Sequence, residues 1–525
     1  MKTAGGIELE LFRHLLVSIA EEMGVVLRKT SYSANIKERR DYSCAVYDSR
    51  GDAVAMGDHM PVHLGAMPLS VRAAMDAFDL QAGDVALVND PFRGGTHLPD
   101  ITAVAPVFTR GRQPAFYLAN RAHHADVGGM SPGSMPLARE IFQEGIRIPP
   151  VLIRRRDKID RALLDLLLAN VRTPVEREGD LMAQIAAIHR GEMRLREMVA
   201  KQGEARVNRN MREIQDYSAR MMQAAIRKLP GGTYRFEDCL DNDGVTANPV
   251  WIRVTMTIAN GRAVVDFSGS DPQVQGSVNA NFAVTLAATM YVFRCLIEDD
   301  VPFTAGILRP IRVIAPEGSV VNALPPAAMA AGNVETSQRI TDVLLGALAQ
   351  AAPERIPAAS SGTMNNLSFG GGSAKNRFAY YETIAGGMGA SAQADGASAI
   401  HTHMTNSWNT PIEAFEHQFP LRITGYRVRR ESGGMGEHRG GDGIVREFQF
   451  LAPADVTLLS DRRERGPWGL AGGGEGKRGS NTLVSRSGRS KQLPAKTRFE
   501  AQPGDVLRIE TPGGGGWGAV KPKPR

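Results

Sequence analysis

Hydrophobic side chains follow a helical spacing at the start of the chain and a strand spacing soon after it. Residues 7–28 (IELELFRHLLVSIAEEMGVVLR) repeat apolar positions every three or four residues, which predicts an amphipathic helix. The segments CAVYD and DAVAM then alternate on either side of a turn at Ser49, Arg50 and Gly51, which predicts a hairpin. DVALVND, which ends at Asp90, has the continuous apolar run of a buried strand.

A second hairpin is predicted directly after that strand. Residues 101–108 (ITAVAPVF) and 115–122 (AFYLANRA) are rich in β-branched and aromatic side chains, and the polar run TRGRQP between them suits a chain reversal. If Phe108 pairs with Ala115, the antiparallel register places Asp100 opposite His123 at the open end. A slip of one residue would present His124 instead, so the pattern alone leaves both registers open.

The remaining chain alternates between helical and strand-rich parts. Residues 161–229 predict two or three helices, including a long one from about Glu178, and Pro230 with the glycines after it marks a boundary. Asn260 and Gly261 predict the turn of another hairpin. Residues 277–297 and 335–350 have helical patterns, residues 362–396 predict loops, and the last hundred residues are rich in strands and turns.

These patterns predict an α+β fold of several lobes, with mixed helices and antiparallel hairpins. We expect an α+β lobe with the second hairpin over residues 1–160 and a helical segment over 161–229. A further α+β lobe is expected over 230–360, and a glycine-rich β lobe over 361–525.

The second hairpin gathers the strongest metal-ligating side chains of the chain. They are His97, Asp100, His123, His124 and Asp126. Two imidazoles and a carboxylate that converge are typical of a Zn, Mn or Fe(II) site with positions left open for water or substrate. The competing interpretation is a polar rim whose histidines only form hydrogen bonds, but the GG and LPD turns suit ligands held on loops.

Three further residues are candidate catalytic groups. Asp41 in ERRDYS and His63 in HMPVHLGAM are predicted in loops of the first lobe, where either can act as a general base or orient a metal ligand. Asp41 is the first candidate for the base. Glu413 lies in HTHMTNSWNTPIEAFEHQ, which we interpret as a second wall of the same pocket; alternatively, Glu413 and Glu416 brace a helix that starts after Pro411.

Composition and charge exclude several classes of protein. The 525 residues are 42% apolar and carry a net charge of +6 from mixed charges, which allows large cores but gives no basic stripe for nucleic acid. The three cysteines are far apart and supply neither a disulfide framework nor a paired-cysteine metal site. This cysteine usage fits a reducing cytoplasm, where we expect the protein. No stretch has the length and apolar character of a membrane span.

Phosphate-binding motifs are also missing. GGGEGKRG places Lys477 after glycines without the spacing of a P-loop, and GMGEHRG misses the dinucleotide-binding spacing by one residue. Both are interpreted as turns. Chemistry that requires a nucleotide would therefore need another chain.

Several motifs together resemble the hydantoinase B/oxoprolinase family. They are ERRDYSCAVYD, HLGAM, NDPFRGGTHLPDITAVAPVF, AHHADVGG, THMTNSWNTPIEAFE and TPGGGGWG, which stand in the order seen in that family and span nearly the whole chain. The family includes B subunits of ATP-dependent N-methylhydantoinase and of lactamases, the C-terminal part of 5-oxoprolinase, and subunits of acetone and acetophenone carboxylases. The resemblance implies metal ligation by His97, Asp100 and His123.

The resemblance also implies a hetero-oligomeric enzyme. A separate hydantoinase A-like subunit with an actin-like ATPase fold would use ATP to phosphorylate the carbonyl oxygen of a small cyclic amide. The metal-containing B subunit would then complete ring opening, with Asp41 accepting a proton from water. A ketone carboxylase subunit is the alternative within the family, although carboxylase subunits tend to be longer. Outside these two functions, the chain could be a non-catalytic scaffold subunit or an amidohydrolase that works without ATP.

Overall fold

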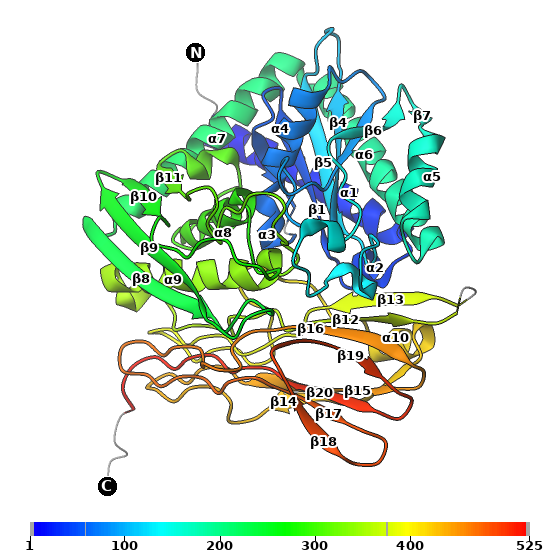
Figure 1. The fold of residues 1–525 in the computed structure, drawn as a ribbon. Coiled ribbons are helices and arrows are strands. Elements are labelled where there is room, and N and C mark those ends of the chain that lie inside the picture. The colour runs from blue at the N-terminus through cyan, green and yellow to red at the C-terminus, as the bar shows by residue number, and fades with distance from the viewer. Residues whose placement is uncertain (1–4, 58, 374–375, 521–525) are drawn as a thin grey trace.

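Three lobes, each with its own hydrophobic core, make up the protein (Figure 1). The computed structural model describes residues 5–57, 59–373 and 376–520. In Figure 1 the first lobe is blue to cyan, the second is green, and the third, yellow to red, lies beneath both. The predicted α+β class is confirmed, with helices and mainly antiparallel sheets throughout.

The first lobe is built on a seven-stranded antiparallel sheet of order β2-β1-β5-β4-β3-β6-β7. Its strands are β1 (Tyr42–Asp48), β2 (Ala53–Met56), β3 (Val85–Val88), β4 (Asp100–Val107), β5 (Phe116–His123), β6 (Val151–Arg155) and β7 (Lys158–Ile159). Its helices are α1 (Gly6–Thr30), α2 (Ala34–Lys37), α3 (Pro61–Leu64), α4 (Met67–Ala77), η1 (Pro132–Ser134), η2 (Ile141–Gln143), α5 (Arg161–Ala169), α6 (Pro174–Gln202) and α7 (Glu204–Arg227). Both predicted hairpins are present.

Helices cover both faces of this sheet, which explains the uninterrupted apolar runs of its strands. Every residue of β4 is buried. Ala103 and Ala105 pack in the same core as Phe12 of α1, whereas Val104 packs on the opposite face with Val71 of α4. Successive side chains of one strand therefore enter two different cores.

The long helix α6 differs slightly from its prediction. It begins at Pro174 rather than near Glu178, because proline at the first helical position has no N–H to leave unpaired. α6 packs on α1 and on β5. The helical segment predicted over residues 161–229 therefore contributes mainly to the core of the first lobe.

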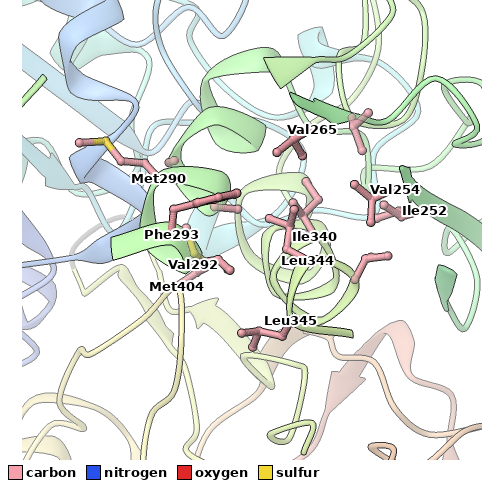
Figure 2. Packing of buried hydrophobic residues seen from close by; sticks show 14 of the residues in the cluster. Ile252, Val254, Val265, Met290, Val292, Phe293, Ile340, Leu344, Leu345 and Met404 are labelled. Atoms are coloured by element: carbon pink, nitrogen blue, oxygen red, sulfur yellow. The ribbon is translucent and has the colours of Figure 1, made fainter. Parts of the chain in front are cut away.

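The second lobe packs two helices on a four-stranded sheet of order β11-β10-β9-β8. Its elements are β8 (Gly232–Leu240), β9 (Val250–Ala259), β10 (Arg262–Asp266), β11 (Ile311–Ile314), α8 (Phe282–Arg294), η3 (Ala305–Leu308), η4 (Gly332–Thr336), α9 (Ser337–Ala351) and η5 (Pro353–Arg355). Figure 2 shows Ile340 and Leu344 of α9 between the sheet side chains Ile252 and Val254 and the α8 side chain Phe293. α9 is therefore a central helix whose residues are buried from Ser337 to Ala349.

The third lobe contains two antiparallel sheets, of order β13-β12-β16-β19 and β14-β15-β20-β17-β18. The elements are β12 (Asn366–Gly371), β13 (Phe378–Glu382), α10 (Ile412–Gln418), β14 (Leu421–Arg429), β15 (Gly443–Phe450), β16 (Ala454–Leu459), β17 (Ser480–Val484), β18 (Ser490–Leu493), β19 (Lys496–Ala501) and β20 (Val506–Glu510). Side chains from both sheets, such as Phe369 and Phe448, share one core. Residues 362–396 form loops around β12 and β13, close to the prediction.

Glycine-rich segments of the third lobe pack backbone against backbone. The buried run Gly513–Gly516 has no room for side chains, because a Cβ on Gly514 would lie 2.0 Å from the main-chain oxygen of Met388. The N–H of Gly514 donates to the oxygen of Gly441 at 2.9 Å, and its own oxygen accepts from Gly434 at 2.8 Å. The closing TPGGGGWG motif is therefore a buried segment whose backbone holds several loops together through hydrogen bonds.

None of the helices in the described ranges is long and apolar enough to cross a membrane.

Candidate metal centre

The β4–β5 hairpin has the register that places Asp100 directly opposite His123. Of the two registers that the sequence left open, the structure has the one expected from pairing Phe108 with Ala115. His124 lies beyond the end of β5 and its Nε2 is 3.0 Å from Oε1 of Gln184 on α6. Asp126 pairs with Arg172 at 2.9 Å. The alternation along the hairpin therefore selects His123 over its neighbour.

His97, Asp100 and His123 form a compact group of potential metal ligands. One ligand atom from each lies within 4.8 Å of the others. Oδ1 of Asp100 is 3.2 Å from Nε2 of His97 and 3.3 Å from Nδ1 of His123. All three side chains are at most 3% exposed, so a cation held there would be shielded from bulk water.

Hydrogen bonds orient the potential ligands from outside the group. Nδ1 of His97 is 3.2 Å from the main-chain oxygen of Ala330, which leaves Nε2 to face Asp100. Oδ2 of Asp100 accepts a hydrogen bond from Thr96 at 2.9 Å and lies 3.3 Å from Nδ2 of Asn333. Partners of this kind fix the ring orientation of metal-binding histidines and hold ligating carboxylates.

Two buried polar atoms of the group lack hydrogen-bond partners among the described residues. They are Oδ1 of Asp100 and Nε2 of His123. Buried polar atoms are rarely left without a partner, and a bound ion is one recognised reason. The two imidazoles and the carboxylate are also the donor types that divalent transition metals prefer. The residues present therefore fit a divalent metal ion.

The charges of the group also suit a cation. Burial opposes ionisation of Asp100, but the imidazoles of His97 and His63 outweigh it and hold the pKa of its carboxyl well below the usual range. Burial lowers the pKa of His123, although Asp100 counteracts part of that shift. An ionised carboxylate and a neutral imidazole are the protonation states that bind metals.

His63 and Asp41 both lie beside the group, as the sequence predicted for the first lobe. His63 is on the short helix α3 rather than in a loop, and its Nε2 is 3.3 Å from Oδ2 of Asp100. Its Nδ1 is 3.0 Å from the hydroxyl of Ser43. Asp41 precedes β1, and its main-chain oxygen accepts the N–H of His123 at 3.0 Å. Its carboxylate is 3.8 Å from the guanidinium of Arg39.

Glu413 is not brought to the metal centre. It is exposed on α10, which packs into the third-lobe core through Phe415. The interpretation of Glu413 as a wall of the same pocket fails because this helix faces β14. The segment just before it does reach the first lobe: Ser407 accepts from Arg39 at 3.3 Å, and Asn406 donates to the oxygen of His59 at 3.0 Å.

Two residues that the sequence did not indicate complete the surroundings of the ligands. Asn333 from the second lobe places Nδ2 3.0 Å from Nε2 of His97. It lies in the π-helical turn η4, and such turns recur at functional sites. Tyr381 from the third lobe stacks on His123, with ring centroids 4.5 Å apart and planes 18° from parallel. The centre is therefore formed where all three lobes meet.

A hydrogen-bonded chain links Tyr381 back to the same π-helical turn. The Tyr381 hydroxyl donates to Oδ1 of Asn366 at 2.8 Å, and Nδ2 of Asn366 donates to Oε1 of Glu335 at 2.7 Å. Burial raises the pKa of Glu335 to about 7. Asn333 and Glu335 stand in the polar run NVETSQ, which follows an apolar segment, but no short-range spacing connects that run to the hairpin.

The fold and the ligand group define a member of the hydantoinase B/oxoprolinase class. The family model for hydantoinase B/oxoprolinase matches residues 5–520, and the chain belongs to this family.

Named relatives are similar over almost the whole chain. 5-oxoprolinase 1 of Arabidopsis thaliana is 38% identical over 98% of this chain, which spans only 42% of that protein. A Pseudomonas protein named as the putative B subunit of a D-/L-hydantoinase is 31% identical, with 99% of this chain and 90% of that protein covered.

Two solved structures share the fold. The ATP-dependent caprolactamase from Pseudomonas jessenii superposes with a TM-score of 0.92 at 28% identity, covering 99% of this chain and 92% of that one. A nucleotide-free acetone carboxylase gives a TM-score of 0.88 at 19% identity, covering 98% of this chain and 75% of that one. The latter similarity is one of fold alone.

Proposed function

We propose that this chain is the metal-containing B subunit of an ATP-dependent cyclic amide hydrolase that opens a hydantoin, 5-oxoproline or lactam ring. The observation that carries the proposal is the buried group of His97, Asp100 and His123 in a chain of this family. The relatives named as a 5-oxoprolinase and as the B subunit of a hydantoinase, and the caprolactamase structure, favour cyclic amides as the substrate class.

The partner would be a hydantoinase A-like ATPase subunit that phosphorylates the carbonyl oxygen of the amide. A phosphorylated oxygen is a better leaving group, so the attached carbon becomes open to attack by water. Water adds to this carbon and the ring C–N bond breaks, with a proton passing to the nitrogen that leaves, so that the ring opens to an acyl phosphate and an amine. A second water then hydrolyses the acyl phosphate to the carboxylic acid and phosphate. The need for a partner agrees with the lack of a phosphate-binding motif in the sequence.

His97, Asp100 and His123 would hold a Zn, Mn or Fe ion. When bound, such an ion supplies Lewis acidity that polarises an oxygen or lowers the pKa of water. Ala330 and Asn333 keep the His97 ring in place. His63 contacts Oδ2 of Asp100, whereas His97 and His123 face Oδ1. The shielding of these side chains keeps bulk water away from the reacting carbon.

Reconstitution with the ATPase subunit tests the proposed function. The purified chain should contain about one divalent metal ion, and ring opening with release of ADP and phosphate should require both subunits and ATP. Consumption of bicarbonate with a ketone, and none of a cyclic amide, would replace the proposal by a carboxylase subunit. Full activity of the complex with His97→Ala and His123→Ala would show a scaffold role. Ring opening by this chain alone without ATP would show a self-sufficient hydrolase.

Asp41 is proposed as the general base that accepts a proton from the attacking water. Asp41→Asn is expected to reduce turnover by roughly 100-fold or more while the metal content stays near that of the unmodified chain, because the amide cannot accept the proton. Steady-state rates and elemental analysis of one preparation measure both quantities. The matched control is Asp48→Asn at the other end of β1, where Asp48 contacts Arg50 at 3.0 Å. Equal turnover of the Asp41 variant and the unmodified chain would contradict the assignment.

A further inference from the structure

A basic cleft opens on the third lobe, and none of its lining residues belongs to the metal centre. Its volume is about 1090 Å³, and its walls come mainly from segments 462–468, 475–479 and 492–495. Pockets for small molecules usually measure roughly 300–1,000 Å³, so the cleft is large enough for a complete metabolite. The segment 475–479 lies in the glycine-rich stretch that does not have P-loop spacing.

Five cationic side chains line the cleft. They are Arg462, Arg463, Arg465, Lys477 and Arg478. Arg462 is already neutralised, because one of its nitrogens lies 2.6 Å from Asp238 and 2.7 Å from Asp342. The other four form no ion pair with any carboxylate in the part of the chain that the structure describes. Four positive charges thus share one cleft without direct partners.

Arg463 is held at the base of the cleft by neutral acceptors. Its guanidinium donates to Oδ1 of Asn365 at 2.8 Å, to Oδ1 of Asn481 at 2.9 Å and to the main-chain oxygen of Asp461 at 2.6 Å. Its Nε has no partner among the described residues, and burial lowers its pKa to about 10. Asp241 accepts the main-chain N–H of Arg463 at 2.7 Å and forms no ion pair with its guanidinium among the described residues.

The remaining three cations are exposed around Arg463. Arg465 donates to the sulfur of Cys239 at 2.8 Å, and Arg478 donates to the main-chain oxygen of Glu464 at 3.0 Å. Lys477 has no side-chain hydrogen bond to the described residues. These contacts leave most of their N–H groups available to a ligand.

We propose that this cleft binds the phosphate group of a small molecule. Apart from the paired Asp238, the carboxylates that line it are Glu464 and Glu475, both exposed, so the unpaired cations exceed them by two. A phosphate monoester carries about two negative charges at neutral pH, which balances this excess. Guanidinium groups match phosphate oxygens in geometry, and lysine adds a point charge.

The cleft and the metal centre are connected by two consecutive residues. Asn365 accepts from Arg463 in the cleft, whereas Asn366 accepts from Tyr381, which stacks on the ligand His123. A phosphate-bearing molecule in the cleft would thus contact Arg463, whose partner Asn365 is adjacent to a residue that supports the metal centre. This link rests on the proposed function, but phosphate binding itself does not.

Calorimetric titration of the purified chain with inorganic phosphate and, separately, with ADP tests the proposal. We expect at least one of them to bind. The double variant Arg465→Gln/Lys477→Gln should bind about tenfold more weakly, because two charge-assisted contacts to the phosphate are lost together. Equal affinities for the two probes identify the phosphate group alone as the ligand. Tighter binding of ADP identifies a nucleotide.

The matched control is Arg212→Gln/Lys158→Gln, which removes the same charges from exposed positions of the first lobe. It should bind both probes like the unmodified chain, and thermal unfolding should show that both variants are folded. The proposal is overturned if neither probe binds, or if the control loses as much affinity as the cleft variant. It is also overturned if the cleft variant only loses its association with the ATPase subunit, which would make the cleft a protein interface. None of these results bears on ring opening, so the proposed function is tested separately.

Discussion

Asp100→Asn is expected to reduce the affinity for a divalent metal by about 100-fold or more, and turnover of the reconstituted complex with it. Changes to outer partners of metal ligands already cost roughly 10- to 100-fold, and Asp100 is a direct ligand in the proposed centre. Asparagine keeps the shape of the side chain but removes the negative charge. It also replaces an oxygen that faces two imidazoles by an amide group.

Elemental analysis and competition with a chelator measure this loss without an activity assay. The matched control is His124→Asn, which changes the adjacent histidine that faces Gln184 instead of the ligand group. Because His124 is buried, this control should lower thermal stability but keep the metal content. An Asp100 variant that retains the metal at the affinity of the unmodified chain would disprove the assignment of the centre.

Gly514→Ala is expected to lower the free energy of unfolding by about 4 kcal/mol or more, or to prevent folding of the third lobe. The new Cβ would lie 2.0 Å from the main-chain oxygen of Met388 and 2.3 Å from its carbonyl carbon. Backbone atoms cannot rotate away as a flexible side chain can. Relief would require separating segments that Gly514 joins through hydrogen bonds to Gly441 and Gly434.

The midpoint of urea unfolding, followed by circular dichroism, measures the effect. Gly111→Ala is the control, because the nearest atoms to a Cβ there are 3.9 Å away and the exposed loop can accept a methyl group. That change should alter stability by no more than about 0.5 kcal/mol. Equal midpoints for the two variants would show that the backbone around the Gly513–Gly516 run can move to accept a Cβ, which contradicts the close packing described above.

Local patterns predicted much of the fold. The helical spacing of residues 7–28 predicted α1, and two apolar runs on either side of a polar turn predicted the β4–β5 hairpin, which has one of the two registers that the pattern allowed. Both predictions depend on periods of a few residues, which the backbone geometry sets directly. The start of α6 was displaced to Pro174 because helix ends depend on single residues and not on the repeating pattern.

Contacts between distant segments were beyond the reach of such patterns. Asn333 contacts His97 across 236 residues, and Tyr381 stacks on His123 from a different lobe. Glu413 was placed at the pocket because it lies in a polar motif, yet α10 turns its apolar face to the third-lobe core and leaves Glu413 exposed. The residues of one segment do not show which lobe that segment will face in the folded protein.

The sequence by itself determined the types of the candidate ligands and the hairpin that carries Asp100 and His123, and the strand period of two limited the facing histidine to His123 or His124. The structure selected the register that pairs Asp100 with His123. The tertiary structure alone decided that a π-helical turn of the second lobe and an aromatic ring of the third lobe enclose those ligands. It also decided that four cations without carboxylate partners share one cleft. These arrangements result from the packing of three separate cores, and no local period encodes them.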